Sequence, residues 1–564
     1  MAGLPAFVVV CLDCGHTATF DPLEITCRNC QSEWREARYD YGRLRGQLLE
    51  RLNYRRFNLW RYEELLPIRV PLPDLTLEAG GTPLIRASNL GTMLGCPNIY
   101  IKDERQGPTA SFKDRQAALT IAALKEAGIS EIVIASTGNV AIAYSAFAAR
   151  AGIKCWAFLT SMVPAEKMRE VALYGTQVVK VTATYDQAKQ LAAEFARQRR
   201  FYLDRGTRSI PSVEAMKTIA FESSEQLSLY FDDSLPPRRK GNTSAWRAPD
   251  WYFQAVSGGI GPVGVHKGYR ELHQMGLIDH IPAMALIQAE GCSPMVQAWQ
   301  AGRSTAEPIV SPRTHIATLA TGDPGRSYTL LYNRLRPDGR SLFESVSDEE
   351  AFQALHLIAK MEGMSVEPAA AVGFAGLIKL VRRGIVKADD VILVNCTGHT
   401  LPVSSNILGN DSTREVVLEE EAAQPTQEEG LLAALQRVTD DRFPRILVVD
   451  DHADARRLIM RILQSQGNYE LLQAENGLQA VSLAGRQQPD LIILDLMMPQ
   501  LDGFAVLDLL KENQTTEHIP VIVVTAKDLT TEERKRLSGR IQSLMQKGNF
   551  LGSDLLDEIQ DSMN

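Results

Sequence analysis

Short apolar runs typical of β-strands alternate with helical stretches along most of this 564-residue chain. Between about residues 76 and 405 the predicted strands are "IYIKD", "EIVIAS", "KCWAFLT", "TQVVKVT", "WYFQAV", "AMALIQA" and "DVILVNC". Helices such as "SFKDRQAALTIAALKEAG" lie between them. Continuous apolar strands separated by helices indicate a mostly parallel sheet that is covered on both faces. The pattern therefore predicts an α/β fold.

The same alternation starts afresh after Pro444. The strands "RILVVDD", "YELLQAE", "DLIILDL" and "IPVIVVTA" predict a separate, doubly wound α/β domain over residues 444–564. Residues 409–443 contain the acidic run "LEEEAAQPTQEEG" and show no strand pattern. We therefore expect a linker with one short helix there.

Two close cysteine pairs stand near the beginning of the chain. "CLDC" supplies Cys11 and Cys14, and "CRNC" supplies Cys27 and Cys30. A redox site needs only one such pair, whereas two pairs complete a tetrahedral Cys₄ zinc site. Residues 1–35 are therefore predicted to form a zinc ribbon with a structural metal, and residues 36–75 to form a helical extension. The other four cysteines lie in apolar surroundings, as small core residues do.

Charge and composition exclude several classes of partner. The net charge of −8 argues against general binding of nucleic acid. No leader peptide pattern and no apolar run long enough for a bilayer stand in the sequence, so we expect no membrane segment. Eight cysteines in a chain of this length do not form a disulfide framework, which favours a reducing, cytoplasmic location.

Lys113 is the candidate catalytic residue. It follows a loop of small residues in "GPTASFKDR" and begins a predicted helix. The positive end of the helix dipole and partial burial both disfavour the ammonium form, as a lysine that forms a Schiff base requires. On position alone, an ordinary lysine in a polar first turn is the better interpretation.

The stretch "SGGIGPVG" raises the question of a dinucleotide site. Gly259, Gly261 and Gly264 have the GxGxxG spacing and follow an apolar strand. Glu290 comes later than the interval of about 20 residues that such a site prefers. A nicotinamide-dependent oxidoreductase is therefore the weaker hypothesis, and the glycines are expected to hold a single phosphate at a helix N-terminus.

Six motifs occur in one order along the chain: "GGTPLI", "GPTASFKDR", "STGN", "SGGIG", "EPAAA" and "CTGH". As an ordered set they resemble the fold-type II pyridoxal-phosphate (PLP) enzymes, and most closely the threonine synthases, many of which also begin with a zinc-ribbon-like block. The resemblance covers about residues 1–405 and implies a catalytic domain over residues 76–408. It also implies an amino-acid substrate and a homodimer.

The resemblance assigns roles to single residues. Lys113 binds the aldehyde of PLP covalently and then moves protons, and Asn139 bonds the ring hydroxyl oxygen. Thr397 places a neutral hydroxyl beside the pyridine nitrogen, which suits elimination or replacement at the β or γ carbon. The phosphate is held by Ser257, Gly258, Gly259, Ile260 and Gly261. The substrate carboxylate is received by Ser136, Thr137, Gly138 and Asn139.

The substrate motif departs from the family. Threonine synthases carry a pattern close to N-P-x-R-x-E-G-x-K-T, whose arginine helps hold the phosphate of O-phosphohomoserine. Here "SIPSVEAMKT" has Ser212 at the arginine position, with Arg205 and Arg208 as the nearest substitutes. Synthesis of threonine is the first hypothesis. A serine/threonine dehydratase, a sulfur-amino-acid lyase and a catalytically silent amino-acid sensor are the alternatives.

Acids follow two predicted strands of the C-terminal domain. Asp450 and Asp451 end "VVDD", and Asp495 ends "DLIILD", so they meet at one edge of a parallel sheet and can bind Mg²⁺. With Thr525 and Lys547 they resemble the receiver domain of response regulators.

That resemblance implies phosphorylation of Asp495 by a histidine kinase or phosphotransfer protein, and Mg²⁺ bound by Asp450, Asp451, Asp495 and Met497. Thr525 and Lys547 would contact the phosphoryl group. Leu544 replaces the usual switch aromatic and Gly548 the usual proline. We expect phosphorylation to regulate the catalytic domain.

Overall fold

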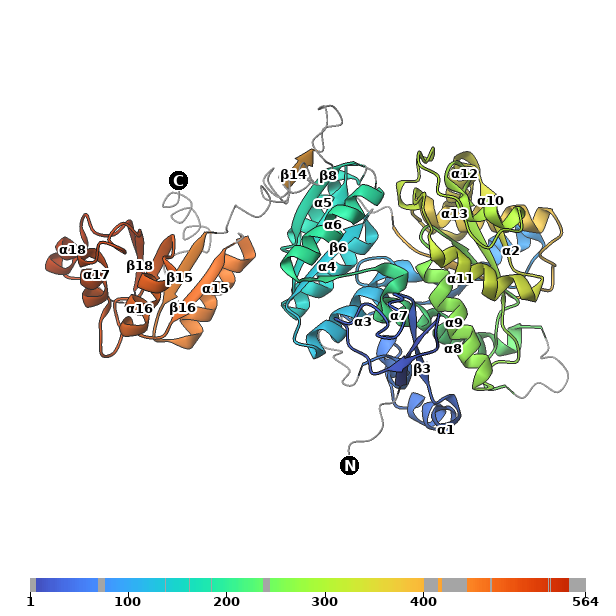
Figure 1. Ribbon diagram of the computed structural model, residues 1–564, viewed down its shortest axis with the longest axis horizontal. Coiled ribbons are helices and arrows are strands. Elements are labelled where there is room, and N and C mark those ends of the chain that lie inside the picture. The colour runs from blue at the N-terminus through green and yellow to red at the C-terminus, as the bar shows by residue number, and fades with distance from the viewer. Residues whose placement is uncertain are drawn as a thin grey trace. The chain divides into compact units, whose positions relative to one another are not determined.

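The computed structural model describes residues 7–68, 77–136, 138–161, 163–183, 185–236, 244–399, 414–417, 444–466, 469–525, 527 and 529–546. The chain divides into two compact units, residues Met1–Leu435 and Gln436–Asn564 (Figure 1). Within the described residues, the first unit contains three sheets and the second contains one.

A small antiparallel sheet with strand order β2-β1-β3 begins the first unit. Its strands are β1 (Phe7–Cys11), β2 (Thr17–Ala18) and β3 (Arg35–Tyr39). The third strand lies in the segment that was expected to be helical, because "REARY" pairs over its whole length with β1 and buries Ala37 and Tyr39. The helical part of that segment follows as α1 (Tyr41–Leu52), which Asp40 caps, and the 3₁₀ helix η1 (Leu59–Leu65).

The six-stranded sheet has the order β12-β11-β10-β13-β5-β4. Its strands are β4 (Leu84–Arg86), β5 (Ile99–Asp103), β10 (Trp251–Ala255), β11 (Ala283–Ala289), β12 (Leu342–Val346) and β13 (Ile392–Cys396). All neighbouring pairs are parallel except β4 with β5. Strands β5, β10, β11 and β13 are almost wholly buried, as the apolar runs predicted.

A second parallel sheet has the order β14-β8-β7-β6-β9. Its strands are β6 (Glu131–Ser136), β7 (Lys154–Thr160), β8 (Gln177–Thr182), β9 (Tyr202–Leu203) and β14 (Arg414–Val417). Strand β14 lies inside the expected linker and pairs with β8 from Arg414 to Val417. The prediction of no strand in the linker was wrong there, because "REVV" finds an edge to pair with. The short helix expected in the linker falls outside the described residues.

Helices cover these two sheets. They are α2 (Ser88–Leu94), α3 (Lys113–Glu126), α4 (Asn139–Ala151), α5 (Ala165–Leu173), α6 (Tyr185–Arg199), α7 (Ile210–Met216), α8 (Thr218–Phe231), α9 (Ile260–Gln274), α10 (Pro294–Gln300), α11 (Arg326–Leu335), α12 (Asp348–Glu362) and α13 (Pro368–Arg382). Helices α4 and α6 pack on β6 and β7, and α13 packs on β10, β11 and β13. Both sheets therefore lie under helices, and the predicted α/β class is confirmed.

The second unit is a parallel sheet with the order β16-β15-β17-β18-β19. Its strands are β15 (Arg445–Val449), β16 (Glu470–Ala474), β17 (Leu491–Leu494), β18 (Val521–Thr525) and β19 (Ser543–Gln546). Its helices are α15 (Ala453–Gln466), α16 (Gly477–Gln487), α17 (Gly503–Glu512) and α18 (Thr531–Leu537). This order places the ends of β15 and β17 side by side at one sheet edge.

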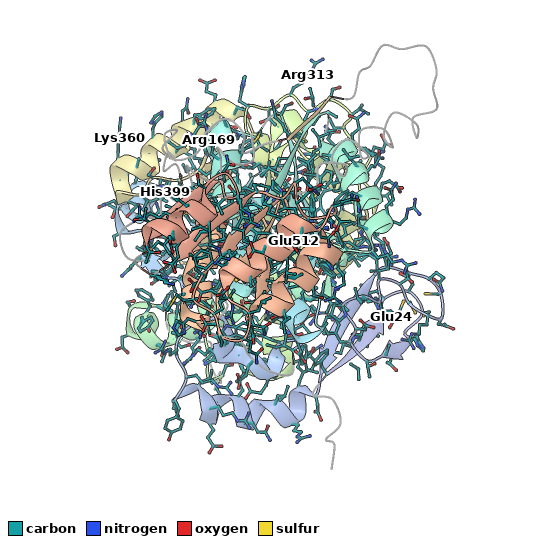
Figure 2. All side chains as sticks on the ribbon, turned by 90° about the vertical axis from the view of Figure 1, so that its left-hand side faces the viewer. Glu24, Arg169, Arg313, Lys360, His399 and Glu512 are labelled. Carbon is teal, nitrogen blue, oxygen red and sulfur yellow. The ribbon has the colours of Figure 1, made fainter. Side chains whose placement is uncertain are left out.

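Charged side chains lie on the surfaces of both units. Arg313 and Lys360 of the first unit and Glu512 of the second are exposed (Figure 2). Among the helices that the structure describes, none has the length and apolar character needed to span a bilayer.

Candidate functional site

Lys113 is the first residue of α3, directly after the loop that leaves β5 and η3 (Glu104–Gln106). Its amine lies 4.4 Å from the centroid of the Phe112 ring. Burial of the amine lowers the pKa of Lys113 to about 8, while the carboxylate of Asp204 acts in the opposite direction. A substantial fraction of this amine is therefore neutral near physiological pH, as nucleophilic attack on an aldehyde requires.

Thr397 is held against the Lys113 loop. It follows β13, the neighbour of β5, and its Oγ1 accepts a hydrogen bond of 3.0 Å from the backbone N–H of Phe112. The N–H of Gly398 donates to the carbonyl of Ala110 at 3.1 Å. Gly398 has a φ of +83°, and a Cβ there would collide with the carboxylate of Glu367. Two backbone hydrogen bonds thus fix the predicted ring contact beside the predicted lysine.

Asn139 begins α4 at the carboxyl end of β6, and both the nitrogen and the oxygen of its side-chain amide form hydrogen bonds. Its Nδ2 donates to Glu367 Oε2 at 2.7 Å, and its Oδ1 accepts from Lys167 Nζ at 2.8 Å. Lys167 also pairs with Glu367 Oε1 at 3.3 Å. Ser136 Oγ accepts from the N–H groups of Gly138 and Ala141 at 3.0 and 3.2 Å, which shapes this turn. Thr137 lies outside the described residues.

Sequence reasoning gave no role to Glu367 or Lys167. The sequence did contain a signal for Glu367, because this residue is the first of the motif "EPAAA" and directly precedes the proline that starts α13. Lys167 had none, since it lies within an ordinary amphipathic helix and reaches Asn139 only through the fold.

The glycine loop, residues 257–261, joins β10 to α9. Gly259 precedes α9 with a φ of +91°, and no side chain caps the helix. The first N–H groups of α9 therefore lack a side-chain acceptor, which makes this terminus suitable for a phosphate. A Cβ at Gly261 would collide with the Gln254 amide and would lie 3.0 Å from the Phe112 ring. Ser257 Oγ donates to Thr321 Oγ1 at 2.6 Å.

These residues fit PLP. The glycine loop provides an uncapped helix N-terminus that tolerates no added Cβ at Gly261, and it touches the residue before Lys113. The amine of Lys113 has a lowered pKa, and Thr397, at the end of β13, provides a neutral hydroxyl against the loop that precedes Lys113. Lys113 would hold the aldehyde of the cofactor, Thr397 would lie at its pyridine nitrogen, and the glycine loop would hold its phosphate.

Ser212, the departure from the substrate motif, lies in a buried polar cluster. Its Oγ donates to Asp204 Oδ1 at 2.9 Å and lies 3.1 Å from Thr120 Oγ1 and 3.2 Å from Tyr144 Oη. Gln116 Nε2 donates to the other oxygen of Asp204 at 3.1 Å. Burial raises the pKa of Asp204. A carboxyl group therefore occupies the neighbourhood in which the family motif supplies a guanidinium.

The sequence analysis did not identify Asp204 as a residue of the site. It follows the two-residue strand β9, and its N–H donates to the carbonyl of Val133 on β6 at 3.0 Å. An acid directly after a strand was the available signal, but a strand of two residues is too short to recognise from periodicity.

The other matched positions of the substrate motif are structural. Lys217 Nζ lies 2.6 Å from Glu214 and 2.9 Å from Glu271, and all three side chains are at most 2% exposed. Arg205 and Arg208, the expected substitutes for the missing arginine, both pair with Glu33 of the N-terminal segment.

The four N-terminal cysteines converge. Their Sγ atoms all lie within 4.8 Å of one another, with Cys11 and Cys30 3.5 Å apart and Cys14 and Cys27 3.7 Å apart. Tetrahedral ligands at a Zn–S distance of about 2.3 Å are about 3.8 Å apart, so the set fits zinc.

The two cysteine turns repeat one backbone pattern. Cys11 N–H donates to the carbonyl of His16 and Cys27 N–H to that of Ser32, at 2.9 and 2.8 Å. Four cysteine ligands would leave no position for a substrate on a metal ion, which is the arrangement of a structural site.

The acids of the second unit also converge. Ligand oxygens of Asp450, Asp451 and Asp495 lie within 4.8 Å of one another. Oδ1 of Asp451 is buried without a hydrogen-bond partner among the described residues, which fits an oxygen that binds a metal ion. Met497 N–H donates to Asp495 Oδ1 at 3.2 Å, and Thr525 is buried at the end of β18. Lys547 and Gly548 lie outside the described residues.

Comparisons with known proteins agree with this geometry. Residues 75–398 match the family of pyridoxal-phosphate dependent enzymes, and residues 446–559 match the response regulator receiver domain. A threonine synthase of Methanocaldococcus jannaschii is 33% identical over 393 residues, which cover 69% of this chain and 92% of that protein. A threonine synthase of Methanosarcina acetivorans is 32% identical over 395 residues, which cover 69% and 91%. The chain therefore belongs to the pyridoxal-phosphate dependent enzymes, joined here to a receiver domain.

Proposed function

We propose that residues 76–408 catalyse an elimination or replacement at the β or γ carbon of an amino acid, with the conversion of O-phosphohomoserine to threonine as the first candidate. The observation that carries this proposal is the Lys113 amine, with its lowered pKa, fixed beside Thr397 and the glycine loop. The threonine synthases that match 69% of this chain support the same reaction class.

PLP, when bound, supplies the electron sink for carbanion chemistry at the substrate. The chain's own residues do the rest. The neutral amine of Lys113 takes a proton from the substrate Cα and returns one to the carbon skeleton. The turn from Ser136 to Asn139, at the N-terminus of α4, receives the substrate carboxylate.

A dehydratase acting on serine or threonine is the second candidate. Asp204 and Ser212 favour it, because the carboxylate of Asp204, whose charge acts on Lys113, would repel a phosphorylated side chain and could accept a hydrogen bond from a hydroxyl. Arg205 and Arg208 are engaged by Glu33 and offer that phosphate little compensation.

The two candidates and the sensor hypothesis separate in one assay. Purified holoenzyme is incubated with O-phosphohomoserine, threonine or serine, and the release of phosphate, threonine and keto acid is measured beside the visible spectrum. Phosphate and threonine support the synthase, and a keto acid supports the dehydratase. A spectral shift without any product supports the silent sensor and contradicts catalysis.

We further propose that a histidine kinase or phosphotransfer protein phosphorylates Asp495 with Mg²⁺ bound by Asp450, Asp451, Asp495 and the backbone of Met497, and that this regulates turnover. The convergence of the three acids supports it. Turnover is compared for the untreated protein, the beryllofluoride-treated protein and Asp495→Ala. Equal rates and substrate affinities in all three would contradict regulation.

We also propose a structural zinc ion, a cytoplasmic location and a homodimer. The cysteine geometry supports a structural zinc ion. None of the eight cysteines, which all lie within the described residues, forms a disulfide, and this supports a reducing, cytoplasmic compartment. We infer a homodimer from the family alone, and sedimentation of the purified protein tests it.

A further inference from the structure

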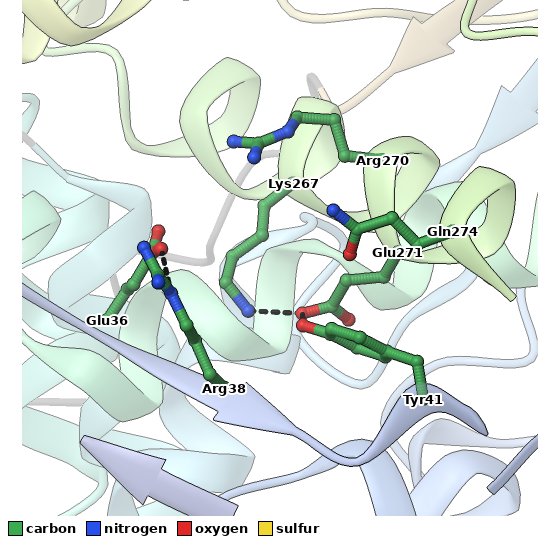
Figure 3. Close-up of a pocket in the computed structure, with 7 residues that line it drawn as sticks. All are labelled: Glu36, Arg38, Tyr41, Lys267, Arg270, Glu271 and Gln274. Carbon is green, nitrogen blue, oxygen red and sulfur yellow. Dashed lines mark hydrogen bonds and ion pairs between the residues drawn. The ribbon is translucent and has the colours of Figure 1, made fainter. Parts of the chain in front are cut away.

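A polar pocket of about 210 Å³ lies between the N-terminal segment and α9 (Figure 3). One wall is formed by β3 and the start of α1, and the other by one face of α9, at the helical spacing i, i+3, i+4 and i+7. The lining residues are Glu36, Arg38, Tyr41, Lys267, Arg270, Glu271 and Gln274. The volume is below the roughly 300 Å³ at which pockets for drug-sized ligands begin, so only a small molecule fits.

The carboxylates of this pocket are already held by cations. Glu36 lies 3.0 Å from Arg38 and 3.1 Å from Arg334 of α11. Glu271 lies 2.9 Å from Lys217, pairs with Lys267 and accepts a hydrogen bond of 3.0 Å from Tyr41 Oη. Neither acid is left to attract a cationic ligand.

The cations are in excess. Arg270 forms no ion pair with any residue in the described ranges. Nη1 of Arg334 is also buried without a hydrogen-bond partner among the described residues. The pKa of the neighbouring His266 falls to about 3, first through burial and then through the charges of Arg334 and Arg270. The local field is therefore positive, and Arg270 extends over the pocket opposite Arg38 (Figure 3).

We propose that this pocket binds a small metabolite through one anionic oxygen group, a carboxylate or a phosphate, on the guanidinium of Arg270. Arginine presents a planar fork of N–H donors that matches either group. The pocket is separate from the proposed cofactor site. It lies on the second half of α9, and the glycine loop leads into the first turn of the same helix.

Two helices link the pocket to that loop. Helix α9 runs from Ile260, directly after Gly259, to the pocket. Helix α11 packs on α9, with Ser327 and Leu331 where a Cβ added at Gly259 would lie, and its Arg334 pairs with Glu36. A ligand on Arg270 would therefore act on the position of the phosphate-binding loop, and the site is suited to an effector of the enzyme.

Equilibrium dialysis of the full-length holoenzyme tests the proposal, with radiolabelled inorganic phosphate in one arm and radiolabelled acetate in the other. Arg270→Gln should weaken binding about tenfold or more, because a charge-assisted hydrogen bond is lost. Arg313→Gln, an exposed arginine outside the pocket, and Lys113→Ala, in the catalytic site, should retain it.

Preferred binding of one ion identifies the group as phosphate or carboxylate. Equal binding by wild type and Arg270→Gln, loss of binding in Lys113→Ala, or no binding of either ion would each overturn the proposal. Because binding is read without turnover, its failure is distinguishable from a failure of the proposed reaction.

Discussion

The backbone N–H of Phe112 donates to the hydroxyl of Thr397 across a separation of 285 residues, at 3.0 Å. This contact joins the end of β13 to the residue before Lys113, so it holds the predicted ring contact beside the predicted nucleophile. It depends on the parallel pairing of β13 with β5, from Ile392 with Ile99 to Cys396 with Asp103.

Replacing Thr397 by valine should lower kcat/KM about 10- to 100-fold. Valine keeps the shape of threonine but leaves the Phe112 N–H without its acceptor, at a cost of about 1–3 kcal/mol. Steady-state kinetics measures the change, with whichever substrate the product assay proposed above establishes. Thr397→Ser retains the hydroxyl and should lose less than Thr397→Val; equal losses would show that the hydroxyl is not what matters.

The attachment of PLP to the apoenzyme should follow the protonation of Lys113. Because burial lowers the pKa of this amine to about 8, the rate of PLP uptake should rise as the pH approaches 8 and level off above it. The carboxylate of Asp204 raises the same pKa, so Asp204→Asn should shift the midpoint to lower pH. Stopped-flow absorbance measures uptake; a midpoint near the ordinary lysine pKa of about 10.4 would contradict the assignment.

The lowered pKa of Lys113 also determines whether the stability of the fold rises or falls with pH. The pKa of this lysine is lower in the folded apoenzyme than in the unfolded chain, so its neutral form favours folding. Its contribution to the free energy of unfolding is fully present above the unfolded pKa of about 10.4 and is lost as the pH falls toward 8. Lys113→Met removes that dependence. Urea unfolding of the two apoproteins at pH 7 and pH 10 should show wild type gaining on the variant at the higher pH.

Asp204→Asn should improve the use of a phosphorylated substrate. The change removes a negative charge beside the position where the family carries an arginine, while Asn can still accept the hydrogen bond from Ser212. We expect a lower KM for O-phosphohomoserine and little change for threonine. Asp389→Asn, an exposed acid elsewhere, serves as the matched control. An unchanged ratio of the two KM values would remove Asp204 from substrate selection.

Loss of the cysteine cluster should destabilise the catalytic domain as well as the ribbon. Tyr39, on the third strand of the small sheet, donates to the buried carboxylate of Glu214 at 3.0 Å, so the two parts share a polar contact. Cys14→Ser should lower the zinc content and reduce the free energy of unfolding by more than about 3 kcal/mol. Metal analysis and thermal unfolding measure both, with Cys96→Ser, a lone buried cysteine, as the control; full zinc content in Cys14→Ser would contradict a Cys₄ site.

Much of the fold could be predicted because its central strands are fully buried. Strands β5, β10, β11 and β13 read as continuous apolar runs, and all were placed correctly. The strands that escaped prediction are short or polar, among them β4, β9, β12 and β14. In β12, "LFESV" exposes its polar residues partly, and its pairing with β11 decides its structure.

The sequence by itself determined the chemistry of the site: a lysine at a helix start, a glycine loop after a strand, four paired cysteines and acids after strands. Each signal is local, since it lies within one turn or one strand end. Only the tertiary structure decided which side chains surround Lys113. The charge of Asp204 acts on Lys113 from the end of β9. Glu367 and Lys167, 200 residues apart in the chain, both bond Asn139. Such contacts arise from the pairing of strand ends at one sheet edge, which no local pattern records.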